Sequence, residues 1–373
     1  MEIIWICLST TTLAIWVSLH LYVDSPEASK LSLRAGLEKF RDGNTLDMFD
    51  ASTDWPLQWR KPFEAVFTIW FPENSVTNSI VGLFWAIQWK RRISAIPGFG
   101  KFSLRQSFIL GHCGIYYKTG ADRRHFEILS SWELEEFARN GQLVFKGLPS
   151  NEELDDRSKS DRLLKSISVF QTLWFFANII YRLSTGLPIS LLEDLAAAYA
   201  FCGLVQLLGW FRCPQDISQP FFVELENPLD NYASSSDESS MNRRRDIWWD
   251  VEIAKWPLVK CVVFTLSAAV FVGVHLAAWN YRFASVVEKW LWRSCSLATL
   301  PLLFVVFIFG NYELQRDCES YWRYRVYKTI TVISSSLYCL ARLALISLAF
   351  AAFRKAPVGI YQDASWTDLI PHI

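Results

Sequence analysis

The stretch Ser166–Phe211 reads SISVFQTLWFFANIIYRLSTGLPISLLEDLAAAYAFCGLVQLLGWF, and it decides the fold class. It contains two apolar runs, Ser166–Leu183 and Pro188–Phe211. Each run is close to the roughly 20 residues that cross a hydrocarbon core as a helix. Only four residues join the two runs, and so short a connection fits an antiparallel helical hairpin. The stretch therefore predicts a membrane-spanning helical protein.

Polar and charged side chains lie within or beside both runs of this hairpin. They are Gln171, Asn178, Arg182, Glu193 and Asp194. A charge at the centre of a membrane helix costs about 2.5–3.5 kcal/mol on insertion scales, so an ionisable residue there is a candidate functional residue. We therefore expect the hairpin to do more than anchor the chain.

The composition of the whole chain also favours a multi-pass membrane protein. The 373 residues are 51% hydrophobic and 16% aromatic, and charged residues make up 20%, below the soluble average of about 25%. Basic and acidic residues both number 37, and this balance argues against a nucleic-acid partner. The eighteen tryptophans fit the aromatic belts of a membrane protein.

Motifs for metal, redox or hydrolytic chemistry are missing from the sequence. The eight cysteines are scattered without a CxxC pair, so neither a disulfide framework nor a zinc site is predicted. There is no GxSxG, HExxH, Walker or GxGxxG motif. We expect no metal and no cofactor.

Five further apolar runs bring the predicted number of spans to about seven, with six or eight as alternatives. They are Ile3–Tyr22, Phe63–Trp89, Leu258–Tyr281, Leu291–Tyr312 and Thr329–Phe353. Pro72 and Glu73 interrupt the second of the seven spans, so a kinked or partly re-entrant helix is expected there. The predicted fold is an all-α, polytopic transmembrane helix bundle with a partly helical extramembrane region.

The expected organisation has six parts. They are the first two spans (1–90), an extramembrane amphipathic and charged region (91–165), the central hairpin (166–211), a polar flexible loop (212–256), three further spans (257–353) and a tail (354–373). The distribution of Lys and Arg places the N-terminus and the loops after the second, fourth and sixth spans in the cytosol.

Local patterns suggest more detail outside the spans. We expect an amphipathic turn around Leu31–Phe40 and an interfacial segment over Phe102–Tyr117. Ser131 precedes several acids and is the expected N-cap of a helix. The aromatic and apolar tail SWTDLIPHI is expected to fold back on the bundle.

Several pieces of the chain resemble a large family of fungal multi-pass membrane proteins, mostly without assigned function. The pieces are CLSTTTLAIWVSLH, the Pro72-Glu73 step, DRSKSDRLLKSISVFQTLWFFANIIYRLSTGLPISLLE, LYCLARLALI and SWTDLIPHI. The chain departs from the family pattern at three places. His20-Leu-Tyr stands where His-Pro-Asn is usual, Lys159-Ser-Asp where Lys-Gly-Asp is usual, and Trp210-Phe-Arg-Cys-Pro where paired Trp and Lys-Pro are usual.

The resemblance implies a function. The branch associated with such proteins is the membrane-bound terpene cyclases of fungal meroterpenoid secondary metabolism, of the ascofuranone, ascochlorin and macrophorin type. No motif separates these cyclases from other members. The resemblance implies an integral membrane enzyme of the endoplasmic reticulum or another endomembrane, with a small hydrophobic, prenylated substrate.

A cyclase of this kind protonates an olefin or epoxide of a farnesyl chain and guides the cation to ring closure. This needs a carboxylic acid in an apolar place and aromatic faces beside the cation. Glu193 and Glu73 are the candidate acids. The alternatives are a helix-start acid for Glu193, near Pro188 and Ser190, and a cap at the helix kink for Glu73. The chain has no DDxxD motif on an apolar helix, so the metal-free reaction is expected.

Other side chains are candidates for the substrate cavity or for charge pairing with the acids. Arg342 and Arg182 are the expected counter-charges, and a structural ion pair is the alternative role. Gln171, Trp174 and Asn178 share a helical face, whose alternative role is helix–helix hydrogen bonding. Asp194, adjacent to Glu193, points about 100° away from it. His275 and His372 are candidate proton shuttles, with simple hydrogen bonding as the alternative.

Two functions stay open from the sequence. The first is the membrane-embedded cyclase, in which spans two, three, four and seven meet around one polar spot. The second is a non-enzymatic membrane protein such as a transporter, receptor or scaffold, because intramembrane charges also occur in transport proteins. Substrate, product and oligomeric state are not specified.

Overall fold

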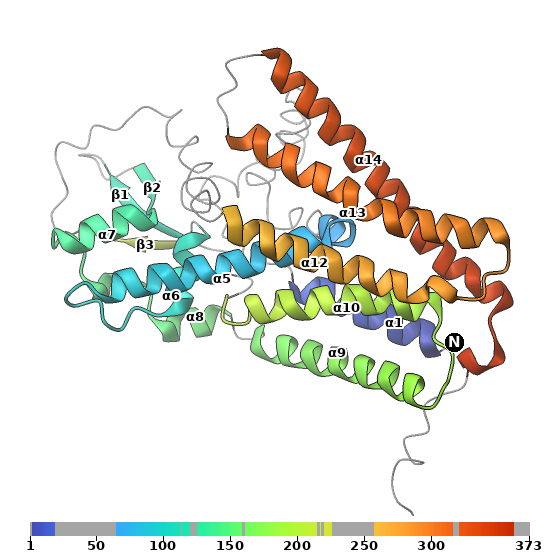
Figure 1. Cartoon of the computed structure of the whole chain (residues 1–373). Helices are drawn as coiled ribbons and strands as arrows, with labels where there is room; N and C mark the ends of the chain where they lie inside the picture. Colours follow the sequence, from blue (N-terminus) through green and yellow to red (C-terminus); the bar gives the residue numbers. More distant parts are fainter. Residues whose placement is uncertain are drawn as a thin grey trace, which may run out of the picture.

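The computed structural model describes residues 2–18, 65–112, 114–119, 125–158, 161–214, 217, 220–225, 257–315 and 321–361. Within these ranges the chain forms a bundle of long helices with a smaller part, built on a sheet, at one end (Figure 1). The long helices are α1 (Glu2–Ser18), α5 (Pro72–Ser94), α9 (Asp161–Ser184), α10 (Leu191–Gly209), α12 (Pro257–Ala277), α13 (Val286–Gln315) and α14 (Tyr321–Ala351).

Five of these helices are long and apolar enough to cross a membrane. Their membrane-compatible stretches are Leu163–Ser184, Leu191–Gly209, Leu258–Asn280, Val286–Phe309 and Arg325–Lys355. Helix α10 is the central one, because 72% of its apolar stretch is buried inside the protein. A mostly helical fold is therefore confirmed, whereas seven spans are not: the five correspond to the last five predicted runs.

The two remaining predicted spans differ from simple membrane helices. The first is described only as far as Ser18, a helix of 17 residues. In the second, helical residues 65–70 stop at Phe71 and α5 begins at Pro72. Proline is well placed there because the first residue of a helix needs no N–H donor. The predicted break at Pro72 is thus observed.

The smaller part at one end of the bundle carries three short helices and a sheet. The helices are α6 (Leu104–Gly111), α7 (Ser131–Arg139) and α8 (Asn151–Arg157), and the strands are β1 (Ile115–Thr119), β2 (His125–Ile128) and β3 (Phe221–Val223). The strand order is β2-β1-β3, with β1 antiparallel to β2 and parallel to β3. We call this end of the bundle the sheet end.

The sheet end corrects two predictions. Residues Phe102–Tyr117 form two elements rather than one continuous segment, since a capping box of Ser103 and Gln106 starts α6 and β1 follows it. The cap of α7 is Ser130 rather than Ser131, with Glu133 completing the capping box. The all-α class therefore needs a small sheet added to it.

The other end of the bundle, which we call the turn end, holds the turn between α9 and α10. It also holds 3₁₀-helices η4 (Ala278–Asn280), η5 (Ala352–Lys355) and η6 (Val358–Tyr361), whereas η2 (Phe145–Gly147) belongs to the sheet end. Helix α1 starts at the turn end, where Cys7 is within electrostatic reach of Glu193 and Arg182 (Figure 1). The start of α1 and the residues that follow α5 therefore lie at opposite ends of the bundle, and the predicted placement of both in the cytosol stays a prediction.

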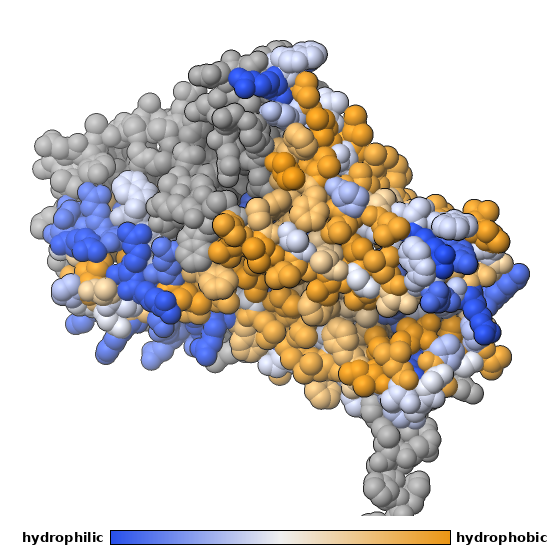
Figure 2. Space-filling model, viewed as in Figure 1, coloured by the Kyte–Doolittle hydropathy of each residue, from blue (hydrophilic) through white to orange (hydrophobic). Residues whose placement is uncertain are grey.

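The surface follows this division. Hydrophobic residues form a broad band over the long helices, and hydrophilic residues gather at the sheet end and at the turn end (Figure 2). Four predicted features lie outside the described residues: the turn around Leu31–Phe40, most of the loop 212–256, the C-terminal segment SWTDLIPHI with His372, and His20.

Candidate functional site

A buried ion pair joins the broken second helix to the last long helix. Glu73 stands in the first turn of α5, where the break at Pro72 places it, and Arg342 lies in the second half of α14. The Arg342 Nη2 atom is 2.5 Å from Glu73 Oε1, and both side chains are 1% exposed. The predicted counter-charge role of Arg342 is thus observed, with Glu73 as its partner.

Tyr338 completes this contact and was not predicted. Its hydroxyl donates to Glu73 Oε2 at 3.1 Å and accepts from Arg342 Nε at 2.8 Å. Tyr338 lies four residues before Arg342, so both side chains project from one face of α14. A carboxylate, a phenol and a guanidinium are therefore held together inside the bundle.

Aromatic rings surround this group. The Cζ atom of Arg342 lies 3.6 Å from the centroid of the Phe271 ring and 5.8 Å from that of Tyr199. Phe71, the residue at the helix break, stacks on Tyr338 with centroids 5.2 Å apart. The Tyr199 hydroxyl donates to the Ile69 carbonyl at 2.8 Å. The site thus combines α5, α10, α12 and α14.

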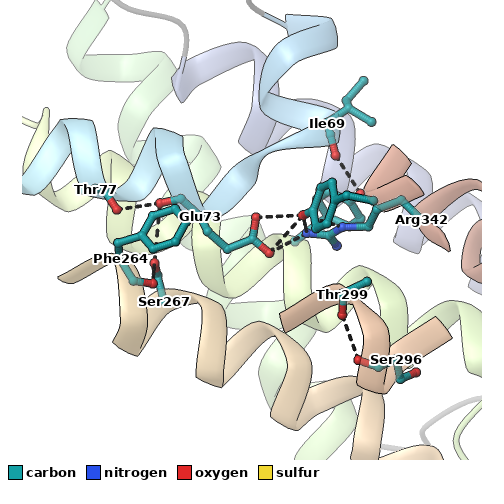
Figure 3. A network of polar contacts seen from close by, with 10 residues as sticks. Ile69, Glu73, Thr77, Phe264, Ser267, Ser296, Thr299 and Arg342 are labelled. Atoms are coloured by element: carbon teal, nitrogen blue, oxygen red, sulfur yellow. Dashed lines mark hydrogen bonds and ion pairs between the residues drawn. The ribbon is translucent and has the colours of Figure 1, made fainter. Parts of the chain in front are cut away.

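Hydroxyl groups satisfy the backbone at the start of α5. The Glu73 carbonyl accepts a hydrogen bond from Thr77 Oγ1 at 2.8 Å and one from Ser267 Oγ of α12 at 3.4 Å (Figure 3). The turn after the break is therefore held both by its own helix and by α12, which fixes the direction of the Glu73 side chain.

A second buried ion pair lies at the turn end. Arg182 Nε is 3.4 Å from Glu193 Oε1, and Glu193 Oε2 accepts from the backbone N–H and the hydroxyl of Ser190 in a capping box. Arg182 Nη2 also donates to the carbonyls of Pro188, Gly359 and Ile360. Glu193 is thus a helix-start acid, which is the alternative that the sequence left open for it.

The two pairs occupy different levels of the bundle. Glu193 belongs to the second pair, and Tyr199 lies beside Arg342 of the first pair. These two residues are six positions apart on α10, about 9 Å along the helix axis. The expectation that spans two, three, four and seven meet around one polar spot is therefore wrong. Helix α9 contributes Arg182 to the second pair, whereas the first pair is built from α5 and α14 with rings from α10 and α12.

The remaining predicted cavity residues lie elsewhere. Gln171 Nε2 donates to Ser9 Oγ of α1 at 3.0 Å, and Asn178 donates to the Trp174 carbonyl of its own helix. The Trp174 side chain is 47% exposed on the bundle surface. Asp194 has one buried carboxylate oxygen without a hydrogen-bond partner among the described residues. The Gln171 contact is a hydrogen bond between helices, which was the alternative role for this face. These positions do not line a shared chamber.

His275, a predicted shuttle candidate, is buried between α12 and α13. Its ring is 4.7 Å from that of Phe271 and 5.9 Å from that of Trp292. Trp292 Nε1 donates to the His275 carbonyl at 3.1 Å. Within the described part of the chain, no three His, Cys, Asp or Glu side chains are grouped in a way that could hold a metal ion.

The fold and the site describe a helical protein with five helices able to cross a membrane and two buried arginine–glutamate pairs. The chain belongs to a family of unknown function (DUF8562), whose profile matches residues 144–247 and 250–373. No curated protein and no solved structure matches the chain. The matched ranges include Glu193 and Arg342, whereas Glu73 lies before them.

Proposed function

We propose that this protein is an integral membrane enzyme, a metal-independent terpene cyclase acting on a prenylated aromatic intermediate of fungal meroterpenoid metabolism. One observation carries the proposal: Glu73 contacts Tyr338 and Arg342 inside a ring of aromatic side chains. The resemblance described above supplies the reaction class. The endoplasmic reticulum or another endomembrane is the proposed location.

In the proposed reaction, the carboxylate of Glu73 first takes up a proton, which ends its charge pairing with Arg342, and Glu73 in this acid form then gives the proton to the terminal epoxide or olefin. With an epoxide, the C–O bond breaks, the oxygen takes the proton, and the neighbouring double bond forms the new C–C bond. Loss of a proton from carbon then ends the cation and returns the proton to Glu73. Arg342 and Tyr338 hold the carboxylate in the interval, and the aromatic faces stabilise the passing cation.

The test is expression of the full chain in a host supplied with a farnesylated phenol or its terminal epoxide. We expect a cyclised product in membranes with the wild-type protein and, per amount of folded protein, a loss of about 10²–10⁴-fold in rate for Glu73→Gln. Glu288→Gln, at a partly exposed pair with Arg354, is the matched control and should keep activity. Absence of product from membranes containing folded wild-type protein would overturn the proposal.

The second candidate is a non-enzymatic membrane protein, such as a transporter, receptor or scaffold. The observation that favours it is that both candidate acids are already paired with buried arginines. In this case Glu73 and Arg342 serve only to join α5 to α14. The double variant Glu73→Gln/Arg342→Met separates the two candidates. A double variant that folds but loses cyclase activity supports catalysis, whereas one that folds and keeps the cellular function supports the structural role.

A further inference from the structure

Three polar side chains at the contact of α12, α13 and α14 are buried with unmet hydrogen-bonding atoms. Among the described residues, no partner completes a well-formed hydrogen bond to Arg342 Nη1, to Ser296 Oγ or to either ring nitrogen of His275, although the His275 ring lies near the Phe271 backbone. The three residues are 0%, 1% and 0% exposed. Buried polar groups nearly always have a partner, and leaving one unmet costs about 1–3 kcal/mol. Three such groups from three helices call for a common explanation.

Ring contacts place Arg342 and His275 on either side of Phe271, and the register of α12 against α13 brings Ser296 to the level of Phe271. The Phe271 ring contacts both the Arg342 guanidinium and the His275 ring. His275 lies level with Trp292 of α13, because Trp292 Nε1 donates a hydrogen bond to the backbone carbonyl of His275. Helices α12 and α13 run in opposite directions, so Phe271 lies level with Ser296, one turn from Trp292. Figure 3 shows Ser296 and Thr299 on the helix that passes below Arg342.

The chemistry of these atoms selects the kind of group that would meet them. Arg342 Nη1 can only donate, while a neutral histidine and a serine can each donate and accept. An oxygen atom suits such a set. Because Glu73 already neutralises Arg342, a neutral oxygen is favoured over an anion. The neighbouring rings of Phe271 and Trp292 suit an apolar or aromatic remainder.

We propose that Arg342, His275 and Ser296 form a recognition site for the neutral oxygen of an otherwise apolar molecule, a phenol hydroxyl or a ring carbonyl. This deepens the proposed function and rests on it for the prenyl tail of the molecule. The unmet atoms are sealed from solvent, so binding requires the Phe271 and Trp292 rings to move aside. Arg342 then links the oxygen to Glu73 and sets the distance between the oxygenated ring and the acid.

The test uses two probes that differ by one hydroxyl group, farnesylphenol and farnesylbenzene. Binding to the purified full chain in lipid nanodiscs is measured by tryptophan fluorescence, without turnover. We expect the wild-type protein to bind the phenol about tenfold more tightly, as one or two buried hydrogen bonds would give. In Ser296→Ala and in His275→Phe this preference should fall towards unity.

Thr299→Val is the matched control, because Thr299 Oγ1 already donates to the Ser296 carbonyl within α13. This variant should keep the preference for the phenol. Equal or absent binding of the two probes to folded wild-type protein would overturn the site. A preference for the phenol that survives in both Ser296→Ala and His275→Phe would also overturn it. Interior water would then be the partner of the three polar groups. An intact preference without cyclised product removes the cyclase proposal and leaves this site standing. Cyclised product without a preference for the phenol removes this recognition site and leaves the cyclase proposal in place.

Discussion

Two buried arginines each hold a glutamate, but their other contacts give them different tasks. Arg342 lies against aromatic rings and contacts Tyr338, so its charge is confined to the middle of the bundle. Arg182 Nη2 donates to three backbone carbonyls. The distance from Arg182 Nε to Glu193 Oε1 is 3.4 Å, longer than the 2.5 Å between Arg342 and Glu73. The first arginine therefore balances an acid, while the second mainly holds chain segments together.

Removing one member of the Glu73–Arg342 pair should strongly destabilise the protein. In Glu73→Gln the guanidinium stays buried without its counter-charge, and breaking a buried pair in this way costs roughly 3–5 kcal/mol. We expect a clearly lower thermal unfolding midpoint in detergent. Arg342→Met combined with Glu73→Gln should recover much of the loss, because no unpaired charge is left.

Glu288→Gln provides the comparison for this prediction. Its partner Arg354 is 65% exposed, so the loss should be about 0–1 kcal/mol. Equal losses at Glu73 and Glu288 would contradict the view that burial makes the first pair important.

At this scale, the sequence identified the charged residues but not their pairing. Glu73, Glu193, Arg182 and Arg342 all stand out as charges in apolar runs. Which arginine meets which acid depends on the packing of helices far apart in the chain. The role of Glu193 could be predicted from Ser190 three residues before it, because a capping box is a local pattern. The Tyr338 contact had a local signal in its four-residue spacing from Arg342, and the ring contacts had none.

Among the elements, α5 and α10 meet through a close approach that depends on glycine. A Cβ atom at Gly209 would lie 2.9 Å from Ser79 Oγ and 3.1 Å from the Ser79 backbone. We therefore expect Gly209→Ala to separate the two helices and to lower stability by about 1–3 kcal/mol, as overpacking does. Thermal unfolding in detergent measures the effect.

Gly273→Ala on α12 is the matched control. It lies in a helix, and a Cβ there meets no atom within 4 Å. The higher helix propensity of alanine should leave stability unchanged or raise it by up to about 1 kcal/mol. A loss at Gly273 as large as that at Gly209 would show that close packing is not the cause.

Helix η6 is fastened to the α9–α10 turn by Arg182. The carbonyls of Gly359 and Ile360 accept from Arg182, and Ile360 is fully buried. Arg182→Gln should therefore free residues 356–361 and open this segment to limited proteolysis at temperatures below the unfolding midpoint of the variant. Arg354→Gln, at an exposed position nearby in sequence, should keep the wild-type cleavage pattern. An unchanged pattern in Arg182→Gln would refute this role.

The elements missed from sequence are those that need distant partners. Strand β1 pairs with β3, with Ile115 opposite Phe221, more than a hundred residues later. No local pattern near β1 announces that pairing. The long helices, in contrast, could be predicted from apolar length alone, and the break at Pro72 from proline chemistry.

For the whole molecule, the direction of α1 fixes how the chain is placed across a membrane. The start of α1 lies at the turn end, and the basic cluster Lys90, Arg91 and Arg92 lies at the sheet end. The positive-inside rule places the sheet end in the cytosol. The N-terminus is then expected on the opposite side.

This arrangement can be measured in sealed microsomes. One full-length variant carries an epitope tag before Glu2 and a second carries the same tag after Lys146, in the sheet end. External protease should remove the tag at Lys146 and spare the N-terminal tag until detergent is added. Removal of both tags from sealed vesicles would contradict the arrangement.

At the whole-molecule scale, composition and run length were sufficient to predict a helical bundle, and five of the seven predicted spans are membrane-compatible helices in the described part of the chain. The side on which α1 begins was not predictable in the same way. The positive-inside rule counts basic residues in loops. The side that it assigns to the N-terminus changes when one predicted span does not cross the membrane.

The distance along the chain between Glu73 and Arg342 has a consequence for how the protein is made. The two residues are separated by 269 positions. At synthesis rates of about 5–20 residues per second, Arg342 is added roughly 15–50 s after Glu73. During that interval the carboxylate has no guanidinium to meet, so the start of α5 cannot take its final place among apolar helices. The last long helix to leave the ribosome is therefore the one that completes the packing of an early one.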